Sequence, residues 1–279
     1  MSKLYNMKIK SFTISLIFLF IYPFNSIRAG IFDEVSGSRS AALGFNSICL
    51  TDFWSAINNQ AGLASIDRMT TGIFVENKFM IQSLSTKSIA LALPLPNGTF
   101  GLSLSQFGET EYNETHIGIS YGMKLTEKLS AGIQLFHYAI NQNNELGRAG
   151  VFSFQGGFIY EHDKNFRIAF HFFNPEFIST NINKPELAGI TKIGMSYRLS
   201  GTLEGFLEVQ SYTKFGNGIN SGIEYRNSDK FAFRIGYSSF SEKITFGIGL
   251  KLKNLMLDFS SSMHNALGYS PQLSIIYEF

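Results

Sequence analysis

The sequence predicts an all-β protein that forms a transmembrane antiparallel β-barrel of about 14 strands. Three observations support this fold class. Large apolar side chains alternate with small or polar ones over many stretches of about ten residues. The composition is rich in Phe (28), Tyr (12) and Gly (26), whereas only 16% of the residues are charged. The sequence also ends in PQLSIIYEF, an alternating apolar strand whose edge would invite aggregation in a soluble domain.

The first segment has the pattern of a secretory signal peptide. Lys3, Lys8 and Lys10 precede the apolar run SFTISLIFLFIYPF, and Ala29 supplies a small residue for cleavage. The alternative is a transmembrane anchor, but a spanning helix needs roughly 20 apolar residues and this run is shorter. We therefore expect residues 1–29 to direct export through a cleaved signal peptide.

The stretch Lys243–Leu252 shows how the two faces of the expected strands differ. Ile244, Phe246 and Ile248 fall on one face, and Thr, Gly and Lys residues make up the other. In a soluble sandwich the second face would carry many charged and long polar side chains. Along this chain the second face is instead dominated by Gly, Ser and Ala. That composition suits a crowded barrel interior, with the large apolar side chains facing lipid.

Counting from Thr71 gives about 14 strands, an even number, each near the length that a tilted spanning strand needs. Connections expected to face the periplasm, such as LTE, HDK and SG, are short. The longest connections, NPEFISTNINKPE and NQNNELGRA, fall on the outside, as in bacterial barrels. Strand 128–141 alternates poorly, so its register stays open. The expected strands are 71–80, 86–94, 98–106, 112–125, 128–141, 150–161, 164–173, 188–199, 202–212, 217–226, 229–239, 242–251, 254–263 and 268–279.

The sequence carries no pattern that calls for catalysis or nucleic-acid binding. The formal net charge is only +2, and the single cysteine excludes an internal disulfide framework. Gly118–Gly122 matches the G-x-S-x-G motif of hydrolases, but it lies within an alternating strand rather than a strand-turn-helix. We expect no enzymatic activity, no metal and no cofactor. The five histidines lack metal-ligand spacing: His116, His137, His162, His171 and His264.

Charged residues on the expected inner face gather on four consecutive strands. Opposite charges on neighbouring strands can pair and so offset the desolvation cost of a crowded interior. Two interpretations stay open: a polar path for ions or solutes, or a salt-bridged filling that rigidifies the wall. We favour the second. The residues are Lys192, Arg198, Glu204, Glu208, Glu224, Arg226 and Arg234.

The last strand has the pattern of an assembly signal. Leu273, Ile275, Tyr277 and Phe279 occupy alternate positions and end on an aromatic residue. This resembles the terminal signal by which the barrel-assembly machinery recognises outer-membrane barrels. The resemblance implies that this machinery is a partner during biogenesis and that the protein resides in the bacterial outer membrane.

The stretch before the first strand resembles the N-terminal region of FadL-type barrels, and more closely their PorV/PorQ-like branch in Bacteroidota. Ser38–Gly44 and Asn58–Ala64 match the run ARSxALGG…NPAGLA, although Phe45 and Gln60 replace a glycine and a proline that are common there. The resemblance implies an N-terminal plug at residues 30–68 inside a barrel of residues 69–279. A periplasmic tail or an extra strand is the alternative. The residues that mark the plug are Trp54, Asn58, Asn59, Gln60, Ala61, Gly62 and Leu63.

Three functional classes follow from these patterns and the resemblance. The PorV/PorQ resemblance implies an accessory or docking barrel linked to type IX secretion, whose partners are secretion-system or other envelope proteins. The FadL-type resemblance implies a channel for small hydrophobic solutes. The third class is a purely structural or assembly barrel. All three share outer-membrane lipid as their surroundings, and we favour the first by resemblance.

Overall fold

The computed structural model describes residues 35–143, 147–175, 187–213, 216–227 and 230–279. The expected signal peptide, residues 1–29, lies outside the described residues, as do residues 30–34 of the expected plug and most of the connection NPEFISTNINKPE. No helix in the part that the structure describes is long and apolar enough to cross a membrane.

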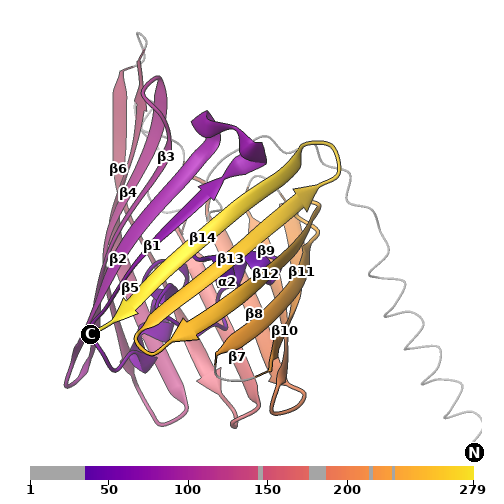
Figure 1. Cartoon of the computed structure of the whole chain (residues 1–279). Coiled ribbons are helices and arrows are strands. Elements are labelled where there is room, and N and C mark those ends of the chain that lie inside the picture. The colour runs from indigo at the N-terminus through magenta and orange to yellow at the C-terminus, as the bar shows by residue number, and fades with distance from the viewer. Residues whose placement is uncertain (1–34, 144–146, 176–186, 214–215, 228–229) are drawn as a thin grey trace, which may run out of the picture. The chain divides into compact units, whose positions relative to one another are not determined.

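Antiparallel strands close into a barrel in which each strand pairs with its neighbours in sequence and β1 pairs with β14 (Figure 1). The number of strands in the described residues is fourteen, so both the predicted fold class and the predicted strand count are confirmed. The strands are β1 Thr70–Asn77, β2 Ser85–Leu95, β3 Gly98–Gly108, β4 Tyr112–Lys124, β5 Leu129–Gln142, β6 Arg148–Glu161, β7 Phe166–Phe173, β8 Ile190–Arg198, β9 Leu203–Tyr212, β10 Gly216–Arg226, β11 Phe231–Ser238, β12 Lys243–Leu252, β13 Leu255–His264 and β14 Gly268–Glu278.

The first strand is shorter than its sequence pattern suggested. We expected it to run to residue 80, but β1 ends at Asn77. Phe79 and Met80 take left-handed backbone conformations, with φ of 55° and 58°, which a strand cannot accommodate. The chain forms two short 3-10 helices there instead, η2 (Lys78–Met80) and η3 (Gln82–Leu84).

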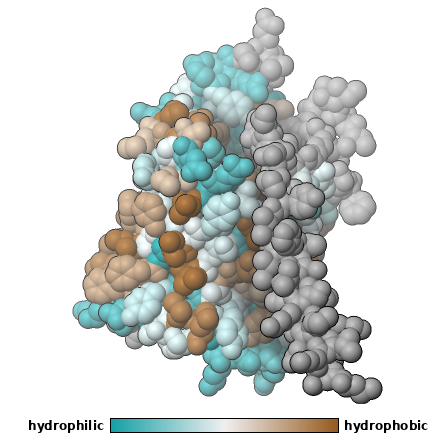
Figure 2. All heavy atoms as spheres, turned by 90° about the vertical axis from the view of Figure 1, so that its right-hand side faces the viewer, coloured by the Kyte–Doolittle hydropathy of each residue, from teal (hydrophilic) through white to brown (hydrophobic). Residues whose placement is uncertain are grey.

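The outward face of the barrel is apolar, as the alternation predicted. On β12, Ile244, Phe246 and Ile248 are 45%, 44% and 54% exposed, whereas the intervening Thr245 is fully buried. The register of β5, which its sequence left open, places Gln134, Phe136 and Tyr138 inward. On the face shown in Figure 2, apolar residues gather between hydrophilic ends. This distribution is that of a wall surrounded by lipid.

Residues 35–66, here called the N-terminal segment, lie inside the barrel and contact inward side chains from both halves of the wall. The segment contains α2 (Ser38–Ala42), α3 (Ser55–Asn58) and the 3-10 helix η1 (Gln60–Ser65). Small inward residues let it approach the wall. A side chain at Gly236 of β11 would clash with the backbone of Gly44, and one at Gly132 of β5 would clash with the backbone of Gln60.

Two apolar clusters join the N-terminal segment to the wall. In the first, Trp54, Ile57 and Leu63 pack with Phe74 and Ile276 of β1 and β14. The second joins Leu43, Ile48, Leu50 and Ala61 to the wall residues Ile159, Ala169 and Phe206. Each large apolar side chain that is fully buried contributes roughly 1.5–3 kcal/mol. The clusters therefore supply the main attraction that keeps the segment in place.

Candidate functional site

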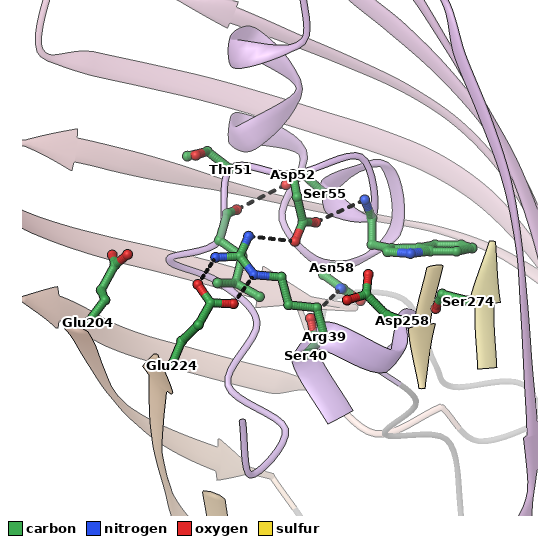
Figure 3. Close-up of polar contacts among 12 residues, drawn as sticks. Arg39, Ser40, Thr51, Asp52, Ser55, Asn58, Glu204, Glu224, Asp258 and Ser274 are labelled. Carbon is green, nitrogen blue, oxygen red and sulfur yellow. Dashed lines mark hydrogen bonds and ion pairs between the residues drawn. The ribbon is translucent and has the colours of Figure 1, made fainter. Parts of the chain in front are cut away.

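Arg39 of α2 links the N-terminal segment to the barrel wall (Figure 3). Its Nε and Nη2 each donate to a different oxygen of Glu224 on β10, both over 2.9 Å. Its Nη1 donates to Asp52 Oδ2 over 3.1 Å. A guanidinium that grips a carboxylate with two parallel bonds fixes both distance and orientation, which a lysine could not do.

Glu224 also accepts hydrogen bonds from two arginines of the wall. Arg234 Nε donates to Glu224 Oε2 over 2.7 Å, and Arg226 Nε donates to Glu224 Oε1 over 2.7 Å. Arg234 Nη1 in turn donates to Asp258 Oδ1 of β13 over 2.5 Å. We call Arg39, Asp52, Glu224, Arg226, Arg234 and Asp258 the anchor cluster.

The anchor cluster contains three cations and three carboxylates, so its formal charges balance. Balance matters because the Glu224 side chain is fully buried, and an unpaired charge there would be very costly. Burial alone disfavours the charged guanidinium of Arg39, but the carboxylates of Glu224 and Asp52 outweigh it and raise the pKa of Arg39. Desolvation offsets much of the attraction in such clusters. The anchor cluster therefore sets the position of the segment more than it stabilises it.

The other inward charges predicted from the sequence also meet the N-terminal segment. Glu208 of β9 accepts the backbone N–H groups of Ser47 and Ile48, over 2.8 and 3.1 Å, and pairs with Lys192 of β8 at 3.7 Å. Glu204 pairs with Arg167 of β7. Arg167 Nη1 donates to Thr51 Oγ1 over 3.1 Å, which connects this pair to the segment as well.

Two of the predicted inward charges are exposed at the rim of the barrel. Arg198 and Arg226 stand at the last positions of β8 and β10, and both are exposed. Arg226 still reaches Glu224, whereas Arg198 has no ion pair among the described residues. The ends of these strands open to solvent, so a charge there needs no buried partner.

Sequence reasoning missed Arg39, Asp52 and Asp258 as members of the site. A signal was present, because Arg39 and Asp52 are the only charged residues between positions 36 and 66. Two opposite charges in an otherwise uncharged stretch indicate that the two residues pair with each other or with charged residues of the barrel wall. Here Arg39 does both.

The residues that marked the expected plug are all buried against the wall. Trp54 is 1% exposed and lies edge-on to the Phe74 ring, with 6.0 Å between centroids. Asn58 joins two parts of the segment, since its side chain accepts from Ser36 N and donates to Ser36 O. Asn59 Nδ2 donates to Ile48 O over 2.8 Å. The remaining buried residues of this set are Gln60, Ala61, Gly62 and Leu63.

A second contact ties the N-terminal segment to the rim of the barrel. The Lys243 ammonium lies 5.4 Å from the Phe45 ring and 5.2 Å from the Phe79 ring, within reach of both π faces. Phe45, which replaces a common glycine of the resembled motif, keeps the left-handed backbone that glycine favours, with φ of 65°. Phe79 belongs to η2, so Lys243 connects the segment to the strand connection between β1 and β2.

Beyond the N-terminal segment, on the side away from the C-terminus, aromatic residues line the interior. Phe136 of β5 stacks on Phe173 of β7 at 5.1 Å and lies 4.5 Å from the His116 ring of β4. Phe136, Tyr138 and His116 are each at most 2% exposed. We call His116, Phe136, Tyr138 and Phe173 the aromatic wall. The rings line the sector of the interior formed by β4, β5 and β7, whereas the inward residues of β13 and β14 at this end are polar, among them Ser262 and Ser270.

The last strand forms the seam that closes the barrel. Leu273, Tyr277 and Phe279 are exposed on its outer face and Ile275 is half-buried there, while Ser274 and Ile276 point inward. Phe279 N donates to Met69 O over 2.9 Å, which continues the pairing of β14 with β1 to the end of the strand. Their role as an assembly signal stays a prediction.

The hydrolase-like motif lies within β4, where Ser120 is an inward residue. Its hydroxyl donates to Ala56 O of the N-terminal segment over 3.5 Å. A nucleophile elbow requires a sharp strand-to-helix turn, which β4 does not make. Among the described residues, no group of three or more His, Cys, Asp or Glu side chains is arranged to hold a metal ion.

No family model matches the chain, and no curated protein matches it. Solved structures match its fold. The Ralstonia pickettii toluene transporter TbuX has a TM-score of 0.63 at 13% identity, over 89% of this chain and 100% of that one. A Pseudomonas aeruginosa FadL homologue has a TM-score of 0.63 at 11% identity, over 90% and 100%. The P. putida toluene transporter TodX has a TM-score of 0.64 at 12% identity, over 86% and 97%.

At these identities the likeness concerns the fold. Most of this chain and nearly all of each matched chain are covered, so the shared part is the whole barrel rather than one hairpin. The chain therefore has the fold of FadL-type outer-membrane barrels.

Proposed function

We propose that the protein is an outer-membrane channel for small hydrophobic solutes, in which residues 30–68 act as the plug. The observation that carries the proposal is the N-terminal segment packed against opposite sides of a FadL-type barrel interior. A segment held in this way obstructs the free diffusion of ions and sugars through the interior. The solutes that such a barrel can transport are then small apolar molecules.

The aromatic wall supports a hydrophobic solute class. Rings present large, flat apolar surfaces on which an aromatic hydrocarbon can stack. Two of the fold neighbours are described as toluene transporters, and a further TodX structure is described as a monoaromatic hydrocarbon channel. We therefore propose monoaromatic hydrocarbons as the solute class.

The accessory-barrel function, which the sequence resemblance favoured, has weaker support. It rests on the match of Ser38–Gly44 and Asn58–Ala64 to the PorV/PorQ-like motif. In the structure both stretches are buried inside the barrel, where a docked protein would not meet them. Their burial favours the channel over the docking barrel.

Uptake of a labelled monoaromatic hydrocarbon by cells that depend on this barrel tests the proposal. The protein should raise the initial uptake rate severalfold above that of cells without it. Replacing Phe136 and Phe173 by Ala should lower the rate, because the stacking surface is lost. Phe158→Ala on β6 is the matched control, since Phe158 is 45% exposed on the lipid side. Equal uptake with and without the protein would refute the channel.

A further inference from the structure

The two rims of the barrel differ in charge. We define the C-terminal rim as the turns and the residues before β1 at the Phe279 end of the barrel, together with the two residues of each strand that are nearest to that end. The described residues of this rim contain ten Lys or Arg against six Asp or Glu. The basic residues are Arg68, Lys124, Lys128, Lys164, Arg167, Arg198, Arg226, Lys230, Lys251 and Lys253, and the acidic ones are Asp67, Glu127, Glu161, Asp163, Glu204 and Glu278.

The opposite rim, defined in the same way, has no such excess. Its described residues contain three basic and four acidic side chains. They are Lys78, Arg148 and Lys243, and Glu76, Glu109, Glu111 and Glu242. The positive charge is therefore a property of one end of the barrel and does not reflect the overall composition.

Most cations of the C-terminal rim are available to an external partner. Lys251 pairs with Glu278 at 3.9 Å, and Arg226 belongs to the anchor cluster. Lys124, Lys128 and Lys253 are exposed and form no ion pair within the described ranges of the chain. The same holds for Arg68, Lys164 and Arg198. These six side chains are therefore free to form a close ion pair with an external group.

Outward aromatic side chains stand at the strand ends of this rim. Tyr197 and Tyr225, which precede Arg198 and Arg226, are 54% and 42% exposed, and Phe279 at the end of β14 is 60% exposed. Exposed tyrosines and other aromatic residues at strand ends mark the level of lipid headgroups in membrane barrels. Arg198 and Arg226 themselves stand on the inward side of their strands, because successive strand residues alternate between the two faces. The cations of the turns beyond the strand ends, such as Lys128, Lys164 and Lys253, lie at the depth of the headgroup phosphates.

The distribution of the cations around the barrel indicates the kind of partner. Apart from Arg68, which precedes β1, they come from five separate turns and the strand ends beside them, those that connect β4 to β5, β6 to β7, β8 to β9, β10 to β11 and β12 to β13. A docked protein would contact one sector of the rim, whereas a lipid leaflet contacts the whole circumference. Basic residues at a membrane surface attract anionic headgroups.

We propose that the C-terminal rim binds the headgroups of anionic phospholipids in the leaflet that surrounds it. The site is annular and is made of single Lys and Arg side chains of the turns that each hold a lipid phosphate, while the outward tyrosines at the strand ends contact the boundary between the headgroups and the acyl chains. It gives the barrel a preferred lipid and a fixed depth. The proposal does not depend on the solute that passes through the interior.

Spin-labelled lipids test this inference on the full chain reconstituted in zwitterionic bilayers. Labelled phosphatidylglycerol should associate with the protein severalfold more strongly than labelled phosphatidylcholine. The triple variant Lys124→Gln, Lys128→Gln and Lys253→Gln should lose most of that preference. The variant Lys78→Gln, Lys87→Gln and Arg148→Gln removes the same charge near the opposite end, where Lys87 is the exposed third residue of β2, and should keep the preference. Heat-modifiable migration confirms that each variant is folded.

Salt dependence of the original protein gives a second measurement that needs no variant. Raising the ionic strength from low to high should bring the two labelled lipids toward equal association, because exposed charges are screened. Equal association at low salt would overturn the inference. So would an equal loss of preference in the two triple variants.

Discussion

Cys49 shows, at the scale of one residue, how tightly the N-terminal segment is enclosed. The side chain is 4% exposed and lies in the apolar cluster with Ile48 and Ala169. Burial raises the pKa of the Cys49 thiol, and the negative charge of Glu208 adds to the shift. The thiolate, which is the reactive form, is therefore suppressed at neutral and mildly alkaline pH.

Cys49 should resist a maleimide reagent in the folded barrel and react fully in denaturant. Since Cys49 is the single cysteine, mass spectrometry of the whole chain reports its labelling directly. The matched control is Cys49→Ala combined with Ser200→Cys, because Ser200 is exposed in the turn after β8 and should react in both states. Rapid labelling of Cys49 in the folded protein would show that the segment leaves the interior.

At the scale of the strand, β12 illustrates why the two faces tolerate different residues. Ile248 points to lipid, whereas Gly247 and Gly249 face Ala42 of α2 and the Arg234–Asp258 pair. The outward positions need apolar side chains because lipid cannot solvate charge. The inward positions need small ones because the N-terminal segment and the anchor cluster occupy the space.

Ile248→Arg should destabilise the barrel by about 2–4 kcal/mol, the usual cost of a cation on the lipid face near mid-membrane. Lys251→Arg is the control, because this inward position near the end of β12 already carries an exposed cation. Equilibrium unfolding by denaturant in lipid bilayers measures both. A larger loss for Lys251→Arg would mean that the two faces are assigned the wrong way round.

At the scale of the whole molecule, the strands and the N-terminal segment have separable tasks. The barrel closes through backbone pairing between neighbouring strands, including β1 with β14, and none of those pairs involves residues 35–66. The segment adds apolar clusters and the anchor cluster on the inside. A barrel without the segment should therefore still assemble.

Deleting residues 35–66 should leave folded barrel in the outer membrane but raise its ion conductance severalfold in planar bilayers. The reason is that Glu208, Glu224 and the other inward charges would then face water instead of the segment. The full-length protein is the reference for both measurements. Equal conductance of the two forms would contradict the proposed plug.

The sequence by itself determined the membrane barrel, its strand count and, for the strands other than β5, the face that each strand turns to lipid. These features depend on the alternation of side chains between the two faces of a strand. The alternation can be read from consecutive residues, without knowing which strand pairs with which. Leu102, Ile248 and Tyr277 are exposed on the outer face as their alternation predicted. The end of β1 was not predictable in this way, because the left-handed conformations of Phe79 and Met80 have no signature in alternation.

Only the tertiary structure decided which charges meet. Arg39 and Glu224 lie 185 positions apart, and the closed barrel brings them to 2.9 Å. Strand periodicity assigned Glu224 and Arg234 to the inner face, yet it could not show that Arg39 of α2 also binds Glu224. A contact between an irregular segment and a curved wall depends on how the barrel closes around it. Each pairing across the interior is therefore set by three-dimensional packing, which no short repeat in the chain encodes.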